Sequence, residues 1–188
     1  MRKHPSLIIA LTLVIVTVGI GYYLYTTEKR RQAELRESER QSLDPEASAL
    51  AEGSNPSVPV KLYLYNRGRV DPKDGFLIAE ERQIYETENK VLQARQIVNE
   101  VLKTRPLFGE EAELRQIYLL EDGTAVVDVS EQTASQLAGG ITSEMAAILS
   151  ITRSLQANIP EISKVRFLIG GRQAETFAGH VSIMQPFM

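Results

Sequence analysis

Short runs of this chain alternate between hydrophobic and polar residues, and two longer runs repeat with helical spacing. The clearest alternation lies in Leu114–Ser130, where two apolar runs flank Glu121–Thr124. An Asp-Gly pair between such runs predicts a β-hairpin with a tight primed turn at Asp122-Gly123, because glycine adopts positive φ without steric penalty. A lone hairpin is marginally stable in water, so other elements must cover its apolar face. In the second run that face consists of Ala125, Val127 and Val129.

The other periodic segments predict strands in pairs, separated by helices. Two amphipathic helices are expected at Asn89–Thr104 and Thr142–Ala157, with a polar loop at Glu131–Gly140 before the second. Gly170-Gly171 predicts a hairpin turn. The further strands are expected at Val58–Tyr65, Phe76–Tyr85, Val165–Ile169, Ala174–Phe177 and Val181–Met184.

This order, β-β-α-β-β-α-β-β, predicts an α+β fold. We expect an antiparallel or mixed sheet of about five to six strands, with two helices packed on one face. The folded domain would cover residues 58–188 and would be preceded by a transmembrane helix.

An uncharged apolar segment, Ser6–Tyr25, follows a short basic head at residues 1–5. As a helix it would span about 30 Å, the thickness of the hydrocarbon core. No small-residue cleavage site follows it, and Tyr22, Tyr23 and Tyr25 stand where interfacial aromatics occur, so we expect an uncleaved anchor. A cleaved signal peptide is the alternative. A polar, partly helical linker would then cover residues 26–57.

The orientation of this anchor is not decided by its flanking charges. Arg2 and Lys3 precede the span, but five basic residues follow it, and the positive-inside rule read literally would place the domain in the cytoplasm. The family resemblance given below favours a cytoplasmic head and an extracytoplasmic domain instead. The five following residues are Lys29, Arg30, Arg31, Arg36 and Arg40.

Composition narrows the possible chemistry. The chain has no cysteine, which excludes a disulfide framework, thiolate catalysis, cysteine-ligated zinc and a lipid-modified cysteine. Its two histidines, His4 and His180, are too few for a multi-histidine metal site. A net charge of −3 gives no electrostatic case for nucleic acid. We therefore expect no metal, no cofactor and no nucleic-acid partner.

Few side chains suggest catalysis. His180 could in principle join Asp128 and Ser130, but no nucleophile-elbow motif surrounds any serine, and a histidine that fixes the tail by a hydrogen bond is the preferred interpretation. For Asp128 we expect a turn-capping or loop-capping role. Glu80 and Arg82 are expected at an exposed edge or in a cross-strand ion pair.

Several segments together resemble the GerMN domain family, the sporulation and spore germination domain. The resemblance covers residues 58–188 and depends on an Asp-Gly-x-Ala-x-Val-Asp hairpin joined to a Gly-His tail. The segments that carry it are Leu62–Tyr65, Leu77–Arg82, Asp122–Ser130, Val165–Gly171, Glu175–Val181 and Pro186-Phe187. Within them, the candidate motif or interaction residues are Glu80, Arg82, Asp122, Gly123, Asp128, Gly171, Gly179, His180 and Pro186.

The resemblance implies a membrane-tethered, extracytoplasmic domain without known enzymatic activity. The expected function is a scaffold or interaction module of the cell envelope, with an envelope protein or a second copy as partner. A role in sporulation or germination would follow only if the organism sporulates. Two alternatives remain: a peptidoglycan or glycan-binding module that uses Tyr63 and Tyr65, and a hydrolase that uses His180.

Overall fold

The computed structural model describes residues 56–66, 75–104, 107–137 and 140–188. In this part of the chain it contains five strands and three helices. In chain order they are β1 Ser57–Tyr65, β2 Leu77–Tyr85, α3 Lys90–Leu102, β3 Leu114–Leu119, β4 Thr124–Val129, α4 Glu131–Ser135, α5 Gly140–Asn158 and β5 Lys164–Ile169.

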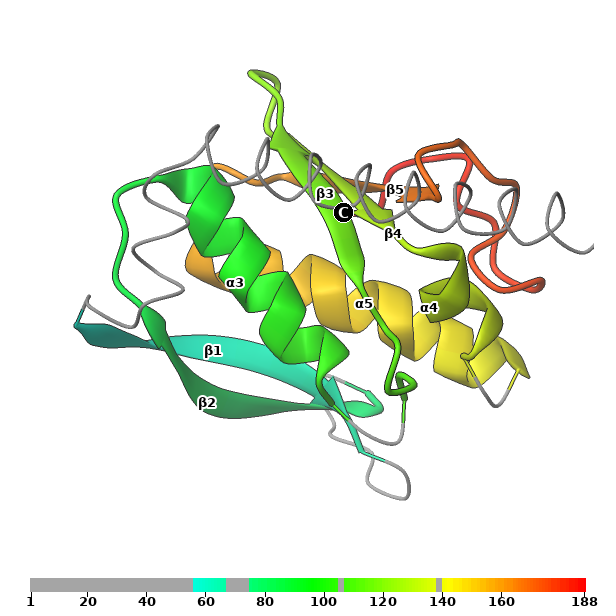
Figure 1. The fold of residues 1–188 in the computed structure, drawn as a ribbon, viewed down its shortest axis with the longest axis horizontal. Helices are drawn as coiled ribbons and strands as arrows, with labels where there is room; N and C mark the ends of the chain where they lie inside the picture. The colour runs from blue at the N-terminus through cyan, green and yellow to red at the C-terminus, as the bar shows by residue number, and fades with distance from the viewer. Residues whose placement is uncertain (1–55, 67–74, 105–106, 138–139) are drawn as a thin grey trace, which may run out of the picture. The chain divides into compact units, whose positions relative to one another are not determined.

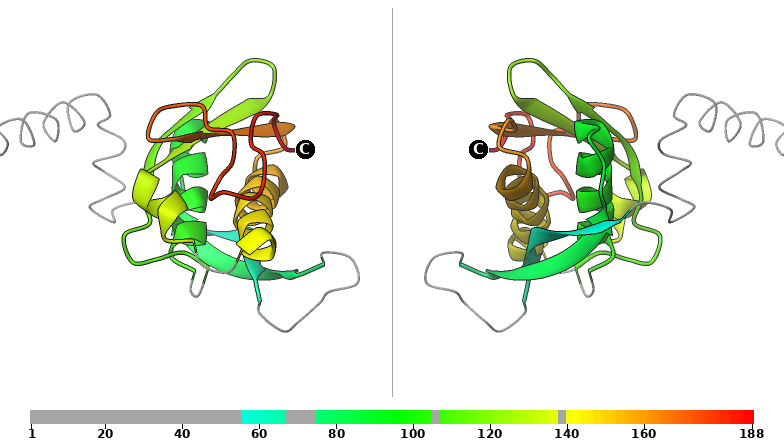
Figure 2. Two further views of the ribbon diagram at one scale, coloured as in Figure 1. Left: turned by 90° about the vertical axis from the view of Figure 1, so that its right-hand side faces the viewer. Right: turned by 90° about the vertical axis from the view of Figure 1, so that its left-hand side faces the viewer.

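The strands form two small sheets, and α3 and α5 lie between them (Figure 1, Figure 2). One sheet is the antiparallel pair β1–β2, and the other has the order β3-β4-β5. In the second sheet β3 and β4 are antiparallel, whereas β4 and β5 are parallel. The α+β class is confirmed, but the expectation of one sheet with helices on one face is wrong.

The physical reason for the sandwiched arrangement is the composition of α5. Its buried positions cover most of the helix circumference instead of forming one stripe, and only the side that carries Met145, Leu149, Arg153 and Gln156 is half-buried. A helix buried in this way needs partners on most of its sides. Small residues allow neighbouring elements to approach closely. The buried residues of α5 are Ser143, Glu144, Ala146, Ala147, Ile148, Ser150, Ile151, Thr152, Ser154 and Leu155.

Both predicted helices and the paired strands are present close to the expected positions. In β1 alternate residues are buried, as predicted: Val60, Leu62 and Leu64 face the helices. The first helix begins after Asn89, whose side chain accepts hydrogen bonds from the N–H groups of Val91 and Leu92. Asparagine at this position satisfies N–H groups that the first helical turn leaves unpaired.

The β3–β4 hairpin forms where the sequence predicts it, but its turn differs. Leu120 donates to the carbonyl of Thr124 at 2.9 Å, which leaves a three-residue loop. Gly123 has φ +77°, and no residue other than glycine has positive φ in the described part of the chain. A primed turn at Asp122-Gly123 would need positive φ at both residues, so that prediction is wrong.

Of two segments after the hairpin, the first differs from expectation and the second agrees with it. The predicted polar loop Glu131–Gly140 contains the short helix α4, because the Ser130 hydroxyl accepts a hydrogen bond from Thr133 N–H and caps it. Gly170-Gly171 does turn the chain, since both glycines have positive φ and Ile169 bridges Arg172.

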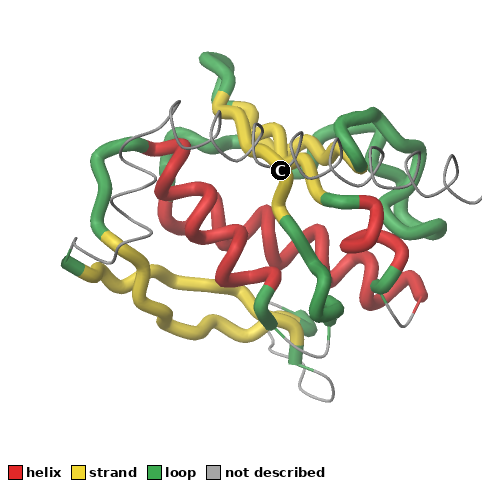
Figure 3. Tube along the Cα trace, in the orientation of Figure 1, coloured by secondary structure: helices red, strands yellow, loops and turns green. Residues whose placement is uncertain are grey.

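The last two predicted strands are absent from the C-terminal tail, which is loop in Figure 3. Ala174–Phe177 and Val181–Met184 share only one isolated bridge, between Thr176 and Ser182. Of the seven segments expected as strands, five are therefore strands in the described chain, fewer than the six in the predicted order. Three backbone N–H groups of the tail, those of Ala178, His180 and Val181, donate to a side chain instead, as described below.

The predicted head at residues 1–5 and the predicted anchor at 6–25 lie outside the described residues, as does the predicted linker at 26–57 except for its last two residues, of which Ser57 begins β1. Within the described ranges, no helix has the length and apolar character needed to cross a membrane. The structure therefore does not bear on the segment Ser6–Tyr25.

Replacing Gly123 by alanine should destabilise the fold more than replacing Gly75. Both glycines have positive φ, of +77° and +66°, so both substitutions carry a backbone strain of about 1 kcal/mol. A Cβ at Gly123 would also stand 2.8 Å from the Glu161 carbonyl, whereas one at Gly75 would meet nothing within 4 Å. We expect Gly123→Ala to lower the unfolding free energy by about 1 kcal/mol more. Urea unfolding followed by circular dichroism measures both, and equal losses would contradict the close approach.

Candidate functional site

The most elaborate polar arrangement in the described chain surrounds Glu144 on α5. Its side chain is only 1% exposed, although it is a carboxylate. One oxygen, Oε1, accepts hydrogen bonds from the N–H groups of Ala178 and Val181, at 2.7 and 2.8 Å. The other, Oε2, accepts the N–H of His180 at 2.9 Å and lies 3.1 Å from Nδ1 of its ring. One buried carboxylate thus binds four groups of the tail.

The charge of Glu144 is stabilised by these contacts. Burial raises the pKa of this carboxyl, but the N–H groups of Ala178, Val181 and His180 and the His180 ring lower it by more. The pKa of Glu144 is therefore held below its ordinary value of 4.5. A carboxylate that accepts several N–H bonds remains ionised even when it is buried.

Aromatic packing fixes the same tail against β5. The ring of Phe167 makes edge-to-face contacts with Phe177 and Phe187, with centroids 5.5 and 5.9 Å apart. Phe187 also exchanges two backbone hydrogen bonds with Val165, each 2.8 Å long. Pro186 immediately precedes this bridge. Phe167 and Phe177 are almost fully buried, so the tail is part of the core.

His180 contacts Glu144 with its backbone N–H as well as with its ring. The side chain is 55% exposed. The contact between its ring and Glu144 is an ion pair only when the ring is protonated. Gly179, with φ +107°, turns the chain so that the N–H groups on either side of it reach Glu144. Its own N–H donates to the hydroxyl of Thr176 at 3.1 Å.

The structure does not bring Asp128 and Ser130 to His180. One oxygen of Asp128 accepts the N–H of Gly171 at 2.8 Å, and the other lies 3.2 Å from Nε of Arg115. Ser130 caps α4 and shares a hydrogen bond with the Thr133 hydroxyl. Asp128 and Gly171 therefore meet each other, which ties the end of β4 to the turn after β5. A Ser-His-Asp arrangement is not formed.

The remaining predicted residues lie at separate places. Glu80 and Arg82 form an exposed ion pair of 2.7 Å along β2. Asp122 lies in the hairpin loop, where its side chain accepts the N–H of Thr124 at 3.0 Å. This hydrogen bonding lowers the pKa of Asp122 from its ordinary value. In the same loop, the carbonyl of Gly123 accepts the N–H of Ser163.

Sequence reasoning missed Glu144, although a signal was present. Glu144 stands four and seven residues before Ile148 and Ile151, so it shares a helical face with two fully buried side chains. A carboxylate at such a position needs buried donors. The donors come from loop backbone 34 to 37 residues later, and the sequence pattern does not show where that loop lies.

Neither a metal centre nor an aromatic platform is evident in the described ranges. They contain no group of three or more histidine, aspartate or glutamate side chains that could hold a metal ion. Tyr63 and Tyr65 are half-buried instead of facing solvent. The ring of Tyr65 packs edge-on against Phe76, and Lys61 lies over the ring of Tyr63.

The chain belongs to the family described as Germane, Sporulation and spore germination, whose model matches residues 61–175. This match confirms the resemblance drawn from the sequence. A comparison with curated proteins gives no significant match.

One solved structure shows the same fold at low sequence identity, and two more are similar to this chain with lower scores. The tandem GerMN domains of the sporulation protein GerM from Bacillus subtilis are 19% identical, with a TM-score of 0.52; the alignment covers 71% of this chain and 46% of that one. The first GerMN domain of the same protein is 21% identical over 68% of this chain and 94% of that one, with a TM-score of 0.49. A candidate lipoprotein from Clostridium perfringens is 17% identical over 70% and 87%, with a TM-score of 0.47.

Replacing Glu144 by glutamine should destabilise the domain strongly. Glutamine has one acceptor oxygen and presents an N–H₂ group to donors, so buried N–H groups of the tail lose their partner, at a cost of about 2–3 kcal/mol. His180→Ala is the control, because it keeps the backbone bond and removes an exposed ring, at a cost of about 1 kcal/mol or less. Urea unfolding of the native protein and of the two variants measures both losses of unfolding free energy. Equal losses for the two variants would show that the ring, and not the carboxylate, holds the tail.

The difference in unfolding free energy between the native protein and the Glu144→Gln variant should decrease at acid pH. Because the folded pKa of Glu144 is lowered, its contribution is fully present above its ordinary value of 4.5 and is lost as the pH falls through the folded pKa. Unfolding free energies of both proteins measured between about pH 7 and pH 3 test this. A gap that stayed constant over this range would mean that Glu144 is not ionised in the folded protein.

Proposed function

We propose that this chain is a non-enzymatic, single-pass protein of the cell envelope. Its GerMN-like domain would lie outside the cytoplasm and would bind other envelope proteins, as an assembly or interaction module. The main support is that Glu144, Asp128 and Ser130, three buried polar groups considered for catalysis, are already bonded to the protein's own backbone or to neighbouring side chains. The family match to sporulation and spore germination proteins agrees with it.

Catalysis needs a polar group that is free to contact a substrate, and a base within reach of the proton that it takes. Glu144 has both oxygens occupied by donors of the tail. The carboxylate of Asp128 is shared between Gly171 and Arg115. His180 presents an exposed ring, but its contacts in the structure lead to Glu144 and to no hydroxyl nucleophile. The geometry therefore favours a surface that binds over a site that reacts.

Anchoring is proposed from the sequence of Ser6–Tyr25, which is long and apolar enough to span a bilayer as a helix. The family match favours a domain outside the cytoplasm. The basic residues after the span oppose this orientation, which makes it the first property to measure.

We give the glycan-binding alternative less weight than protein binding. It depends on solvent-facing Tyr63 and Tyr65, and both rings are engaged by neighbouring side chains. A hydrolase that uses His180 lacks the converging groups it needs. We therefore retain protein binding as the function.

A reporter fused after Met188 should show that the C-terminus lies outside the cytoplasm. Alkaline phosphatase fused there should be active, and green fluorescent protein fused there by the same export route should be dark. The matched control is a fusion directly after Pro5, before the span, which should give the reverse pattern. The reverse pattern at Met188 would place the domain in the cytoplasm and overturn the proposed location.

A further inference from the structure

The two sheets of this fold have four outer edges, and the fold closes two of them with its own atoms. Along β1, the side chain of Asn158 bonds both the N–H and the carbonyl of Lys61, at 2.9 and 2.7 Å. The hydroxyl of Ser154 accepts the N–H of Tyr63 on the same edge. Along β5, the bridges of Val165 with Phe187 and of Ile169 with Arg172 cover the edge. Unpaired strand edges attract other chains, and both of these are blocked.

The edge of β2 remains open over its middle. In an antiparallel pair, alternate residues point both backbone groups toward the partner strand or away from it. Lys61 and Tyr63 point away from β2, so their counterparts Glu81 and Ala79 point away from β1. Gln83 follows the same alternation. The backbone N–H and carbonyl groups of Ala79, Glu81 and Gln83 have no hydrogen-bond partner in the described part of the chain, whereas Gln96 bonds both groups of Tyr85.

The fourth edge, along β3, is a poorer platform for another strand. Its register shifts between Leu114 and Gln116, and such an irregularity twists an edge away from regular pairing. By contrast, β1 and β2 pair without interruption over nine residues, from Ser57–Tyr85 to Tyr65–Leu77. Of the two open edges, β2 therefore offers the longer regular row of donors and acceptors.

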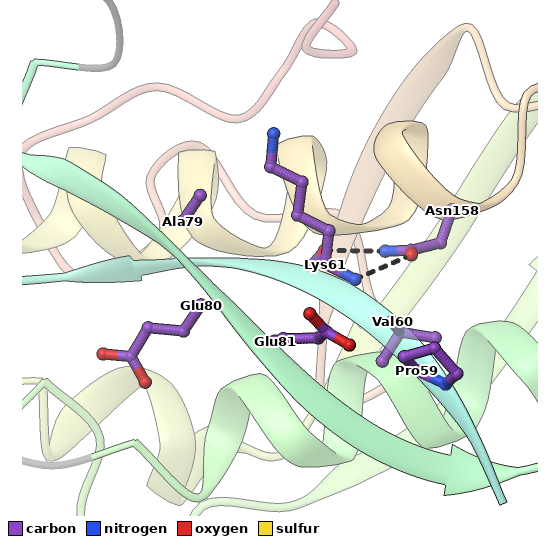
Figure 4. A pocket seen from close by; sticks show the side chains of 7 residues that line it. All are labelled: Pro59, Val60, Lys61, Ala79, Glu80, Glu81 and Asn158. Carbon is purple, nitrogen blue, oxygen red and sulfur yellow. Dashed lines mark hydrogen bonds between the residues drawn. The ribbon is translucent and has the colours of Figure 1, made fainter.

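A pocket of about 440 Å³ adjoins the open edge (Figure 4). It extends across β1 from the end of α5 to β2. Figure 4 shows Lys61 and Ala79 directed to the same side of the strands and Glu80 to the other. The small side chain of Ala79 leaves room beside it for a larger side chain from a neighbouring strand. The pocket is lined by Pro59, Val60, Lys61, Ala79, Glu80, Glu81 and Asn158.

We propose that β2 accepts an extended segment of another envelope protein as a third strand of the β1–β2 sheet. This inference rests on the proposed function and assigns it a surface. Backbone groups of Ala79, Glu81 and Gln83 pair with the added strand, which is how sheet edges bind peptides. A large side chain of the partner that lies beside Ala79 fills the pocket.

Charge identifies the kind of segment that fits. Glu81 is exposed and forms no ion pair within the described residues, and its cross-strand neighbour Lys61 lies over the ring of Tyr63. The partner residue that exchanges hydrogen bonds with Glu81 has its side chain on the same face and directly opposite. A lysine or arginine there makes a cross-strand ion pair, so the expected partner segment is basic.

The same charge disfavours a second copy of this chain. In the two-fold register where Ala79, Glu81 and Gln83 of both copies all pair, each Glu81 faces the other Glu81. Like charges directly opposite destabilise an antiparallel pair. A heterologous basic strand avoids this repulsion, whereas a second copy in this register does not.

Site-specific photocrosslinking of the full chain in its native membranes tests the proposal. A photoreactive phenylalanine at position 79, 81 or 83 should attach to one segment of one partner, and the attachment point should move by about two residues from one position to the next. The segment should carry lysine or arginine opposite position 81. The control is the same group at Tyr118, which is 50% exposed on the other sheet and should not attach to this segment.

Each outcome separates the inference from the function on which it rests. Adducts at Tyr118 or at exposed Met184, with none from β2, would overturn the edge as the binding surface and leave protein binding standing. No adduct from any position would count against both. Adducts between β2 and a second copy, or attachment points scattered over a partner, would overturn a basic strand as the occupant.

Variants at position 81 add a quantitative test. Glu81→Lys should reduce the adduct yield from position 79 about fivefold, because it repels a basic strand. Glu121→Lys makes the same charge change in the hairpin loop of the other sheet and should leave the yield unchanged. Glu81→Pro should reduce the yield about tenfold, since it removes an outward N–H that the β1 ladder does not use. Unchanged yields in both Glu81 variants, with thermal unfolding showing them folded, would overturn the proposal.

Discussion

The position of α5 between two sheets is the constraint on which the rest of this structure depends. It meets β1 on one side, β5 on the other and α3 alongside, and its fully buried face includes Ile148, Ile151 and Leu155. A helix enclosed in this way cannot leave polar groups unsatisfied at low cost. Two of its polar side chains bind other parts of the chain, Glu144 near the start of the helix and Asn158 at the end, whereas the buried hydroxyls of Ser150 and Thr152 have no hydrogen-bond partner in the described part of the chain.

Those polar contacts explain why the acidic residues of this chain are structural. A tail without regular secondary structure has backbone donors that no sheet or helix satisfies, and buried donors need acceptors. Glu144 supplies acceptors for three of them, and Asp128 does the same for the turn after β5. The carboxylates that a search for catalysis would select are thus the ones that the fold requires.

Much of the local structure was predictable from the sequence, but its assembly was not. Alternation located β1, β2 and β4, and helical spacing located α3. The sequence did not show that the strands separate into two sheets, since that depends on α5 being buried over most of its circumference. It also misjudged the tail, where glycine and alternating residues suggested strands. The acceptor that holds the tail, Glu144, lies 34 to 37 residues before the N–H groups that it binds. The spacing of hydrophobic residues indicates local structure only, so it does not show such a distant contact.

The candidate site was predicted in parts. His180 and Gly179 were singled out by residue type, and both lie at the contact between the tail and α5. Their partner Glu144 was not, because its role is visible only after the tail is folded over the helix. The Asp128–Gly171 contact was likewise not predictable from the sequence. Each residue was a candidate by itself, and the structure shows that they are hydrogen-bonded to each other.

The hydrogen bonds between β1 and Asn158 join residues 97 positions apart. A two-stranded sheet is marginal by itself, so the N-terminal pair of strands gains its support only after α5 has been synthesised. Contacts of such long sequence separation slow folding, because a long loop must close before they form. During synthesis or export, the first strands of this domain would therefore remain exposed until most of the chain has followed. A nascent domain of this kind depends on chaperones or on rapid completion to avoid premature association.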